Sequence, residues 1–129
     1  MDPVKVLQRA YQDELLDALR AAGAAQGVPY PHVRALLLEV ARRERAHAEA
    51  LAEALRRRGA PLPPTPKPEE GGWETLLRLL SEEGLDRAYY LESTFPDPEL
   101  EALFTRLGQE ERLNQEAVRK AVMLIGGGL

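Results

Sequence analysis

Residues 40–51 read Val-Ala-Arg-Arg-Glu-Arg-Ala-His-Ala-Glu-Ala-Leu, and this stretch decides the fold. It lies within residues 31–58, whose apolar residues recur at alternating intervals of four and three, the spacing of a packed helix. Glu44 and His47 occupy two consecutive positions in that row. A carboxylate and an imidazole are therefore expected on the buried face of a helix. Burying an ionised carboxylate is costly, so a compensating partner is expected beside it.

Proline and glycine residues divide the chain into four segments with helical periodicity. The expected helices cover residues 3–22, residues 31–58, a third segment from residue 69 or 73 to 93, and residues 98–123. Asp2 and Asp97 each precede a proline, which is the typical pattern of an N-cap followed by the first helical position. Gly59 follows the second segment as a terminating glycine. The expected fold class is all-α.

The lengths of the connections indicate a topology. The first and second helices are joined by a short loop, as are the third and fourth, and short loops make antiparallel neighbours. Residues 60–68 are rich in proline and can cross the length of a bundle in an extended conformation. We therefore expect one domain over residues 1–129, an antiparallel four-helix bundle of two hairpins joined by a long crossover. The alternative is a flexible linker between two hairpins, each of which would bury too little surface alone.

The other three segments repeat the interrupted apolar row. Glu111 and Asn114 interrupt the fourth, Glu14 the first and Glu83 the third. Glu14 and Glu44 are separated by nearly the same number of residues as Glu83 and Glu111, so their carboxylates are expected at similar heights. Four glutamates and His47 should then meet in mid-bundle. Protonation, arginine partners or metal ions must neutralise such a cluster, because like charges at short range repel strongly.

The two halves of the chain also match locally around these positions. Residues 13–17 read Asp-Glu-Leu-Leu-Asp, and residues 82–86 read Glu-Glu-Gly-Leu-Asp. Residues 40–51 align in the same way with residues 107–118, where Asn114 takes the place of His47. These matches indicate an internal duplication.

This ordered set of residues resembles rubrerythrin-type members of the ferritin-like superfamily. In that family the first and third helices each supply a glutamate, and the second and fourth each supply Glu-x-x-His, to a two-metal site. The resemblance implies iron or manganese, as one ion or a dinuclear pair, and oxidation of Fe(II) by dioxygen or peroxide, or reduction of peroxide. The metal ligands that it implies are Glu14, Glu44, His47, Glu83 and Glu111.

The sequence departs from the family pattern in three respects. Asn114, a poor metal ligand beside imidazole, replaces the histidine of the fourth helix, so the second metal position is expected to bind weakly. Asp86 follows Glu83 by three residues and is a candidate extra ligand. The cysteine-ligated electron-transfer domain of full rubrerythrins is missing, so redox turnover would need an outside electron donor.

Two further interpretations remain open beside a metal enzyme. Glu44 and His47 could form a structural pair in a metal-free bundle that serves as a dimerisation or interaction module. A weaker alternative is an iron-carrying cargo protein that assembles with others. Tyr11 and Tyr90 lie on the buried rows and are expected to be core residues that hydrogen-bond a ligand rather than redox-active groups.

Composition excludes several functions and suggests partners. The net charge of −4 argues against nucleic acid, and the lack of cysteine removes zinc-thiolate, iron–sulfur and thiol chemistry. No apolar run approaches membrane-spanning length and the start lacks the shape of a signal peptide, so a cytoplasmic protein is expected. A homodimer is also expected, because these leucines lie outside the main apolar rows: Leu36, Leu38, Leu77 and Leu103.

Overall fold

The computed structural model describes residues 2–68 and 73–126, with the side chain of Trp73 excepted. Four α-helices make up most of this part of the chain: α1 (Pro3–Gln26), α2 (Pro31–Arg57), α3 (Trp73–Glu92) and α4 (Pro98–Gly126). No strand occurs in the described residues. The expected all-α class is therefore confirmed. The alternative start of the third helix at residue 69 falls outside the described residues.

Capping residues set most helix ends where the sequence predicted them. The Asp2 carboxylate accepts a hydrogen bond of 3.0 Å from the backbone N–H of Val4 at the start of α1. Asp97 does the same for the N–H of Glu99 at the start of α4, at 2.9 Å. After α2, Gly59 has a φ of 65°, the left-handed conformation that glycine adopts at little cost.

Two helix ends were predicted too early. Helix α1 continues past residue 22 to Gln26, and α4 continues past residue 123 to Gly126. Gly23 does not stop α1, because Ala24 and Ala25 after it have high helix propensity and are buried in the core. Packing of the extra turn therefore outweighs the cost of one glycine in the helix.

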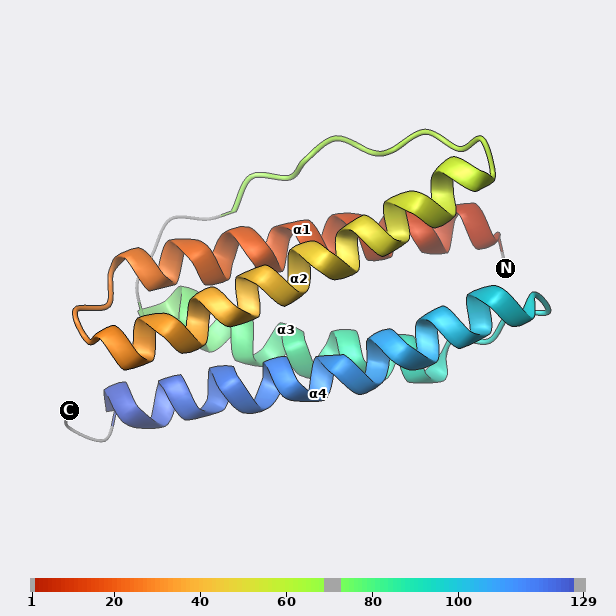
Figure 1. Cartoon of the computed structure of the whole chain (residues 1–129). Coiled ribbons are helices and arrows are strands. Elements are labelled where there is room, and N and C mark those ends of the chain that lie inside the picture. The colour runs from red at the N-terminus through yellow and green to blue at the C-terminus, as the bar shows by residue number, and fades with distance from the viewer. Residues whose placement is uncertain (1, 69–72, 127–129) are drawn as a thin grey trace.

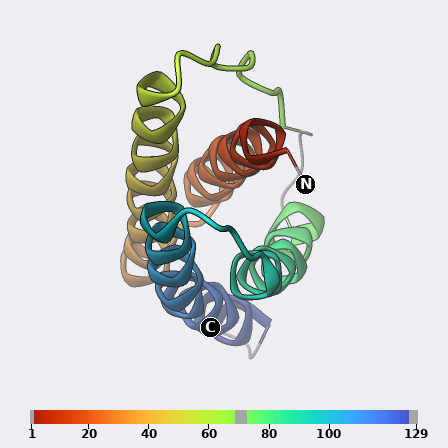
Figure 2. The ribbon, with the colours of Figure 1, turned by 90° about the vertical axis from the view of Figure 1, so that its right-hand side faces the viewer.

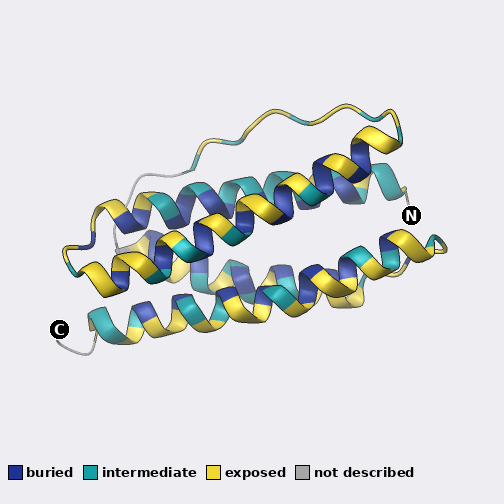
Figure 3. Ribbon diagram, viewed as in Figure 1, coloured by how far each residue is buried: buried dark blue, intermediate teal, exposed yellow. Residues whose placement is uncertain are grey.

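The helices pack as two adjacent pairs. Helix α1 packs mainly against α2 and α3 against α4, while α2 also contacts α4 and α1 contacts α3. In the diagonal pairs α1–α4 and α2–α3 no Cα atoms come within 8 Å of each other over the described residues, so these helices meet only through side chains at the centre. Figures 1 and 2 show the four helices side by side around a common centre. Figure 3 shows that each turns a buried stripe inward, which confirms a helical bundle.

Two apolar clusters fill the bundle, one toward each end. One contains Val33, Leu37, Leu79 and Val118, and the other contains Leu7, Leu51 and Phe104. The carboxylates of the sequence analysis come from helical turns that lie between these clusters. A polar layer thus separates two apolar ones.

Side-chain contacts hold residues 60–68, here called the connector, and the helix ends. The side-chain amides of Gln8 and Gln12 in α1 donate hydrogen bonds to the carbonyls of Pro61 and Pro64, at 3.0 and 3.2 Å. The connector therefore lies beside α1, as Figure 1 shows. At the end of α2, the Arg58 guanidinium donates to Asp97 Oδ2 at 2.7 Å, next to the start of α4.

A glycine lets α3 and α4 approach closely. A Cβ at Gly108 would lie 2.7 Å from Leu91 Cδ2 and 3.2 Å from Tyr90 Cβ. Both distances are shorter than ordinary van der Waals contacts.

No helix among the described residues is long and apolar enough to cross a membrane.

Candidate metal centre

The polar layer consists of side chains that the apolar rows carry into the core. Glu14, Glu44, Glu83 and Glu111 are all 0% exposed, and His47 is 2% exposed. They come from all four helices, because each row of apolar residues is interrupted at the same height. The prediction that these five side chains would be buried is confirmed.

Four of the five predicted ligands form one group. Glu14, Glu44, His47 and Glu111 each offer a ligand atom, and these atoms all lie within 4.8 Å of one another. His47 Nδ1 lies 2.9 Å from Glu111 Oε1 and 3.4 Å from Glu14 Oε2. The first nitrogen of the imidazole therefore faces the carboxylates of α1 and α4.

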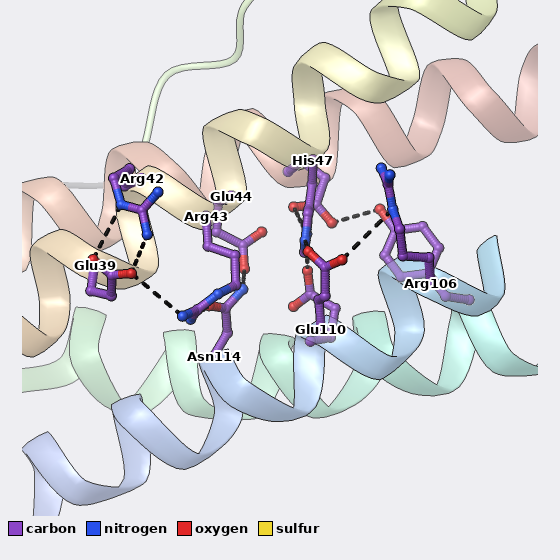
Figure 4. A network of polar contacts seen from close by, with 11 residues as sticks. Glu39, Arg42, Arg43, Glu44, His47, Arg106, Glu110 and Asn114 are labelled. Carbon is purple, nitrogen blue, oxygen red and sulfur yellow. Dashed lines mark hydrogen bonds and ion pairs between the residues drawn. The ribbon is translucent and has the colours of Figure 1, made fainter. Parts of the chain in front are cut away.

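The second nitrogen of the imidazole is held from the opposite side. His47 Nε2 lies 3.0 Å from Glu110 Oε1, a carboxylate on α4 that is partly exposed (Figure 4). Glu110 also pairs with Arg106, at 3.6 Å. When Glu110 accepts the Nε2–H, the imidazole keeps a lone pair on Nδ1, as in carboxylate–histidine–metal arrangements. Glu110 was not predicted from the sequence, in which it looks like a solvated residue beside Glu111.

Asn114 faces Glu44 at the position where the duplication would place a histidine. Its side-chain amide donates a hydrogen bond to Glu44 Oε1. Its carbonyl accepts a hydrogen bond of 2.7 Å from Arg43 Nη1, and Arg43 in turn lies 3.6 Å from Glu39 (Figure 4). A chain of polar contacts therefore connects the buried Glu44 to a partly exposed arginine.

The fifth predicted ligand, Glu83, belongs to a second group. Asp17, Glu83 and Asp86 offer oxygens within 4.8 Å of one another, and all three residues are buried. Asp86 was a candidate ligand in the sequence, whereas Asp17 was missed. A signal was present, because Glu14-x-x-Asp17 in α1 repeats the spacing of Glu83-x-x-Asp86 in α3.

The first group holds one ion pair and excess carboxylate. Burial lowers the pKa of His47, but its hydrogen bonds to Glu111 and Glu14 outweigh that effect and raise the pKa to about 10. Burial raises the pKa of Glu111, but hydrogen bonds from Glu83 and His47 lower it to about 2. Burial, and then repulsion from Glu111, raises the pKa of Glu14 to about 8. A charged His47–Glu111 pair beside protonated carboxyl groups is thus the favoured state without metal.

The remaining carboxyl groups are also protonated more readily than in water. Burial, followed by repulsion from other carboxylates of the layer, raises the pKa of Glu44 well above its usual range. The pKa of Glu83 is also raised, by burial first and by Glu111 next. Burial raises the pKa of Asp17 to about 7, and burial with the neighbouring Asp17 raises that of Asp86 to about 11. The layer therefore contains more carboxyl groups than its positive charges, on His47 and Arg20, can neutralise.

Tyr90 is a core residue that hydrogen-bonds a candidate ligand. Its hydroxyl donates to Glu14 Oε1 at 2.6 Å and its ring packs edge-on against Phe104. Tyr90 is 3% exposed, as predicted, whereas Tyr11 is only half-buried. The Tyr90 hydroxyl thereby fixes one oxygen of Glu14 and leaves Glu14 Oε2 facing His47.

The unpaired carboxylate oxygens of the polar layer are suited to bind a cation. Within residues 2–68 and 73–126, one oxygen each of Glu14, Glu44 and Glu111 is buried without a hydrogen bond of good geometry. For Glu14 Oε2 the nearest donor is His47 Nδ1, at 3.4 Å. A buried carboxylate oxygen without a partner is costly. The three oxygens and His47 Nδ1 are the atoms that an iron or manganese ion would need.

Comparison with protein-family models, with curated proteins and with solved structures found no match to this chain. The geometry of the polar layer therefore carries the functional argument.

Proposed function

We propose that this chain is a metal-binding carboxylate protein of the ferritin and rubrerythrin type, which holds iron or manganese between Glu14, Glu44, His47 and Glu111. One observation carries the proposal. Four buried ligand atoms from three helices lie within 4.8 Å of one another, and three carboxylates there keep an unpaired oxygen. A divalent cation supplies the positive charge that the layer lacks and takes the place of its protons.

The chemistry of the donor set favours iron or manganese. Three carboxylates offer hard oxygen ligands, and one imidazole adds a nitrogen of intermediate character. Copper and zinc prefer more nitrogen or sulfur, and the chain contains no cysteine. Glu110, outside the group, holds the second nitrogen of His47 and so orients the ring toward the ion.

The arrangement of the helices supports the same proposal. Helices α1 and α2 follow one another through a short loop and pack together, as do α3 and α4, and the connector passes beside α1 (Figure 1). Two hairpins with a long crossover and antiparallel neighbours make the ferritin-like topology. We include this topology in the proposal.

A bound iron or manganese ion would supply electron exchange with dioxygen or peroxide, either to oxidise Fe(II) or to reduce peroxide. The chain would supply the other elements of the site. Its carboxylates neutralise the ion, and the Tyr90 hydroxyl orients Glu14 through a hydrogen bond. The apolar clusters on both sides of the layer limit access of water. Electrons for repeated turnover would come from an external donor.

Metal titration of the full chain tests the proposal. Fe(II), under anaerobic conditions, or Mn(II) is added to wild type, Glu44→Ala, His47→Ala and the control Glu49→Ala, whose side chain is exposed on the same helix. We expect metal to raise the melting temperature of wild type and Glu49→Ala. A hundredfold excess over the dissociation constant corresponds to about 2.7 kcal/mol of stabilisation. Both site variants should lose this rise and bind less metal by elemental analysis.

The interaction module is the alternative that this experiment separates. The polar layer is a structural relic if Glu44→Ala and His47→Ala bind as much metal as wild type. It is also a relic if wild type itself binds no metal. The metal-binding proposal then fails, and a dimerisation or interaction module becomes the better account of the bundle.

A further inference from the structure

We propose a second cation position beside the first, built only of carboxylates: Asp17 on α1 with Glu83 and Asp86 on α3. The sequence pattern places a second ion between Glu83 and the residue at position 114. In the structure the side-chain amide of Asn114 is engaged by Glu44 and Arg43, whereas Glu83 is grouped with the two aspartates. The inference goes beyond the proposed function, because it concerns a different set of ligands.

The three carboxylates have the spacing of a cation site. Their oxygens lie within 4.8 Å of one another. Hard divalent cations bind oxygen at about 2.0–2.6 Å, so two ligands on opposite sides of one ion are about 4–5 Å apart. The side chains come from two neighbouring helices that contact each other directly. A single ion can therefore reach an oxygen of each without a change in the backbone.

Unpaired oxygens indicate that the group is built to hold a ligand. Glu83 is 0% exposed, and its two oxygens have no hydrogen-bond partner among the described residues other than neighbouring carboxyl groups that keep a proton. Asp17 Oδ2 and Asp86 Oδ2 are also buried, and only a proton on Asp86, donated to Asp17, can pair these two groups. The unpaired oxygens are an observation separate from the spacing of the group, because they show that the surrounding protein supplies too few hydrogen-bond donors.

Arg20 pairs with one of the two carboxylate oxygens of Asp17. Its guanidinium lies 3.5 Å from Asp17 Oδ1, and both side chains are almost fully buried. The contact holds one oxygen of Asp17 and leaves the other, Oδ2, for a ligand. Arg20 is thus a positioning residue for Asp17.

The donor set distinguishes this position from the first. It contains three carboxylates and no imidazole, a set that suits Mn(II) and other hard divalent cations. The first position has His47, which adds affinity for transition metals. The repeat of Glu-x-x-Asp in α1 and α3 supplies the two aspartates and one of the two glutamates to this position.

Counting bound Mn(II) tests the second position without any assay of activity. Equilibrium dialysis against Mn(II), followed by elemental analysis, is applied to four forms of the full chain. They are wild type, the double variant Asp17→Asn/Asp86→Asn, His47→Ala and the control Asp13→Asn, whose side chain is partly exposed on α1. Asparagine keeps the shape of aspartate, and circular dichroism checks the helical content. If the double variant does not fold, Asp86→Asn alone replaces it.

The expected result is two ions per chain in wild type and in Asp13→Asn, and one fewer in each of the other forms. A double variant that binds as many ions as wild type overturns the second position. A single ion in wild type that depends on His47 also overturns it, while the proposed function stands. A single ion that survives His47→Ala but not the double variant supports the second position and overturns the first. No bound Mn(II) in wild type overturns both.

Discussion

The side-chain amide of Asn114 donates a hydrogen bond to Glu44, the first residue of the only Glu-x-x-His in the chain. The same asparagine accepts a hydrogen bond from Arg43, whose guanidinium brings a positive charge close to the layer. Because the amide nitrogen donates to Glu44 and the amide oxygen accepts from Arg43, the oxygen is turned away from the Glu44 carboxylate and toward the arginine. The contact therefore removes one ligand from the polar layer and makes the two ends of the layer unequal.

Replacing Asn114 with histidine should restore that ligand. The imidazole would offer a nitrogen beside Glu44, and Arg43 would lose its acceptor. We expect Asn114→His to bind Fe(II) or Mn(II) more tightly than wild type in a titration followed by metal counting. The control is Asn114→Leu, which has a similar volume but no ligand atom and should show no gain. Equal affinities for the two variants would contradict this prediction.

Replacing Glu110 with glutamine should weaken metal binding without unfolding the bundle. Glu110 fixes the ring of His47 through Nε2, and removal of such outer partners lowers metal affinity by about 10–100-fold. The matched control is Glu116→Gln on the same helix, because Glu116 pairs with Arg112 as Glu110 pairs with Arg106. Isothermal titration with Mn(II) measures both. An unchanged affinity in Glu110→Gln would mean that His47 needs no orientation from outside.

The metal-free chain should lose stability as the pH rises from about 5 to about 8. Burial raises the pKa of Glu14 to about 8 and that of Asp17 to about 7, so above their ordinary values the unfolded chain has released protons that the folded chain retains. The charged form of His47, with its pKa raised to about 10, contributes fully below its ordinary value and less as the pH rises. All three groups therefore act in the same direction.

Thermal melting at a series of pH values measures this effect with and without Mn(II). The lowered pKa of Glu111 acts only below its ordinary value, so it leaves this range unaffected. Because a bound cation takes the place of protons, the rise in melting temperature on adding metal should grow with pH. A metal-free protein that melts highest at pH 8 would be inconsistent with buried carboxyl groups in the layer.

Two glycines should respond in opposite ways to alanine. Gly23→Ala should raise the free energy of unfolding by about 0.5–1 kcal/mol, because nothing lies within 4 Å of the added methyl group and alanine favours the helix. Gly108→Ala should lower it by about 1–2 kcal/mol, because overpacking against Leu91 and Tyr90 outweighs the gain in helix propensity. Urea denaturation compares them. Equal stabilisation by both would show that α3 can move aside freely.

The chain should form a homodimer at micromolar concentration. Leu38 on α2 and Leu77 on α3 are 48% and 42% exposed, while Leu36 and Leu103 are partly buried. Two of the four predicted leucines are thus exposed, and Leu85, Leu91 and Leu113 are exposed as well, so apolar surface remains on α2, α3 and α4. Size-exclusion chromatography with light scattering measures the mass, and Leu38→Lys with Leu77→Lys should reduce it. A monomeric wild type would exclude this assembly.

The centre of the layer was predictable because an interrupted row leaves little choice. A residue between two buried turns of a helix is itself buried, so Glu44, His47, Glu111 and Asn114 follow from spacing alone. Asp17 did not follow, because the apolar row of α1 continues from Glu14 to Ala18, four residues later, and Asp17 lies beside that row. Helix α1 contacts both α2 and α3, and a helix with two neighbours buries a stripe wider than one row.

The contacts that orient the layer were beyond the sequence for a different reason. Glu110 and Arg43 each lie at a position that the sequence pattern allows to face solvent. Their partners, His47 and Asn114, belong to another helix. Which of several charged residues turns inward depends on how α2 and α4 are rotated against each other. Periodicity within one helix carries no information about that rotation.

Hydrogen bonds of the polar layer run between the α1–α2 pair and the α3–α4 pair, among them Tyr90 to Glu14, His47 to Glu111 and Asn114 to Glu44. The layer therefore joins two halves of the molecule, each of which is a pair of helices packed against each other. We expect unfolding to begin at the boundary between the α1–α2 pair and the α3–α4 pair, so that the two pairs separate before their helices unfold. A cation held by carboxylates from both pairs would oppose this separation and so slow the first step of unfolding.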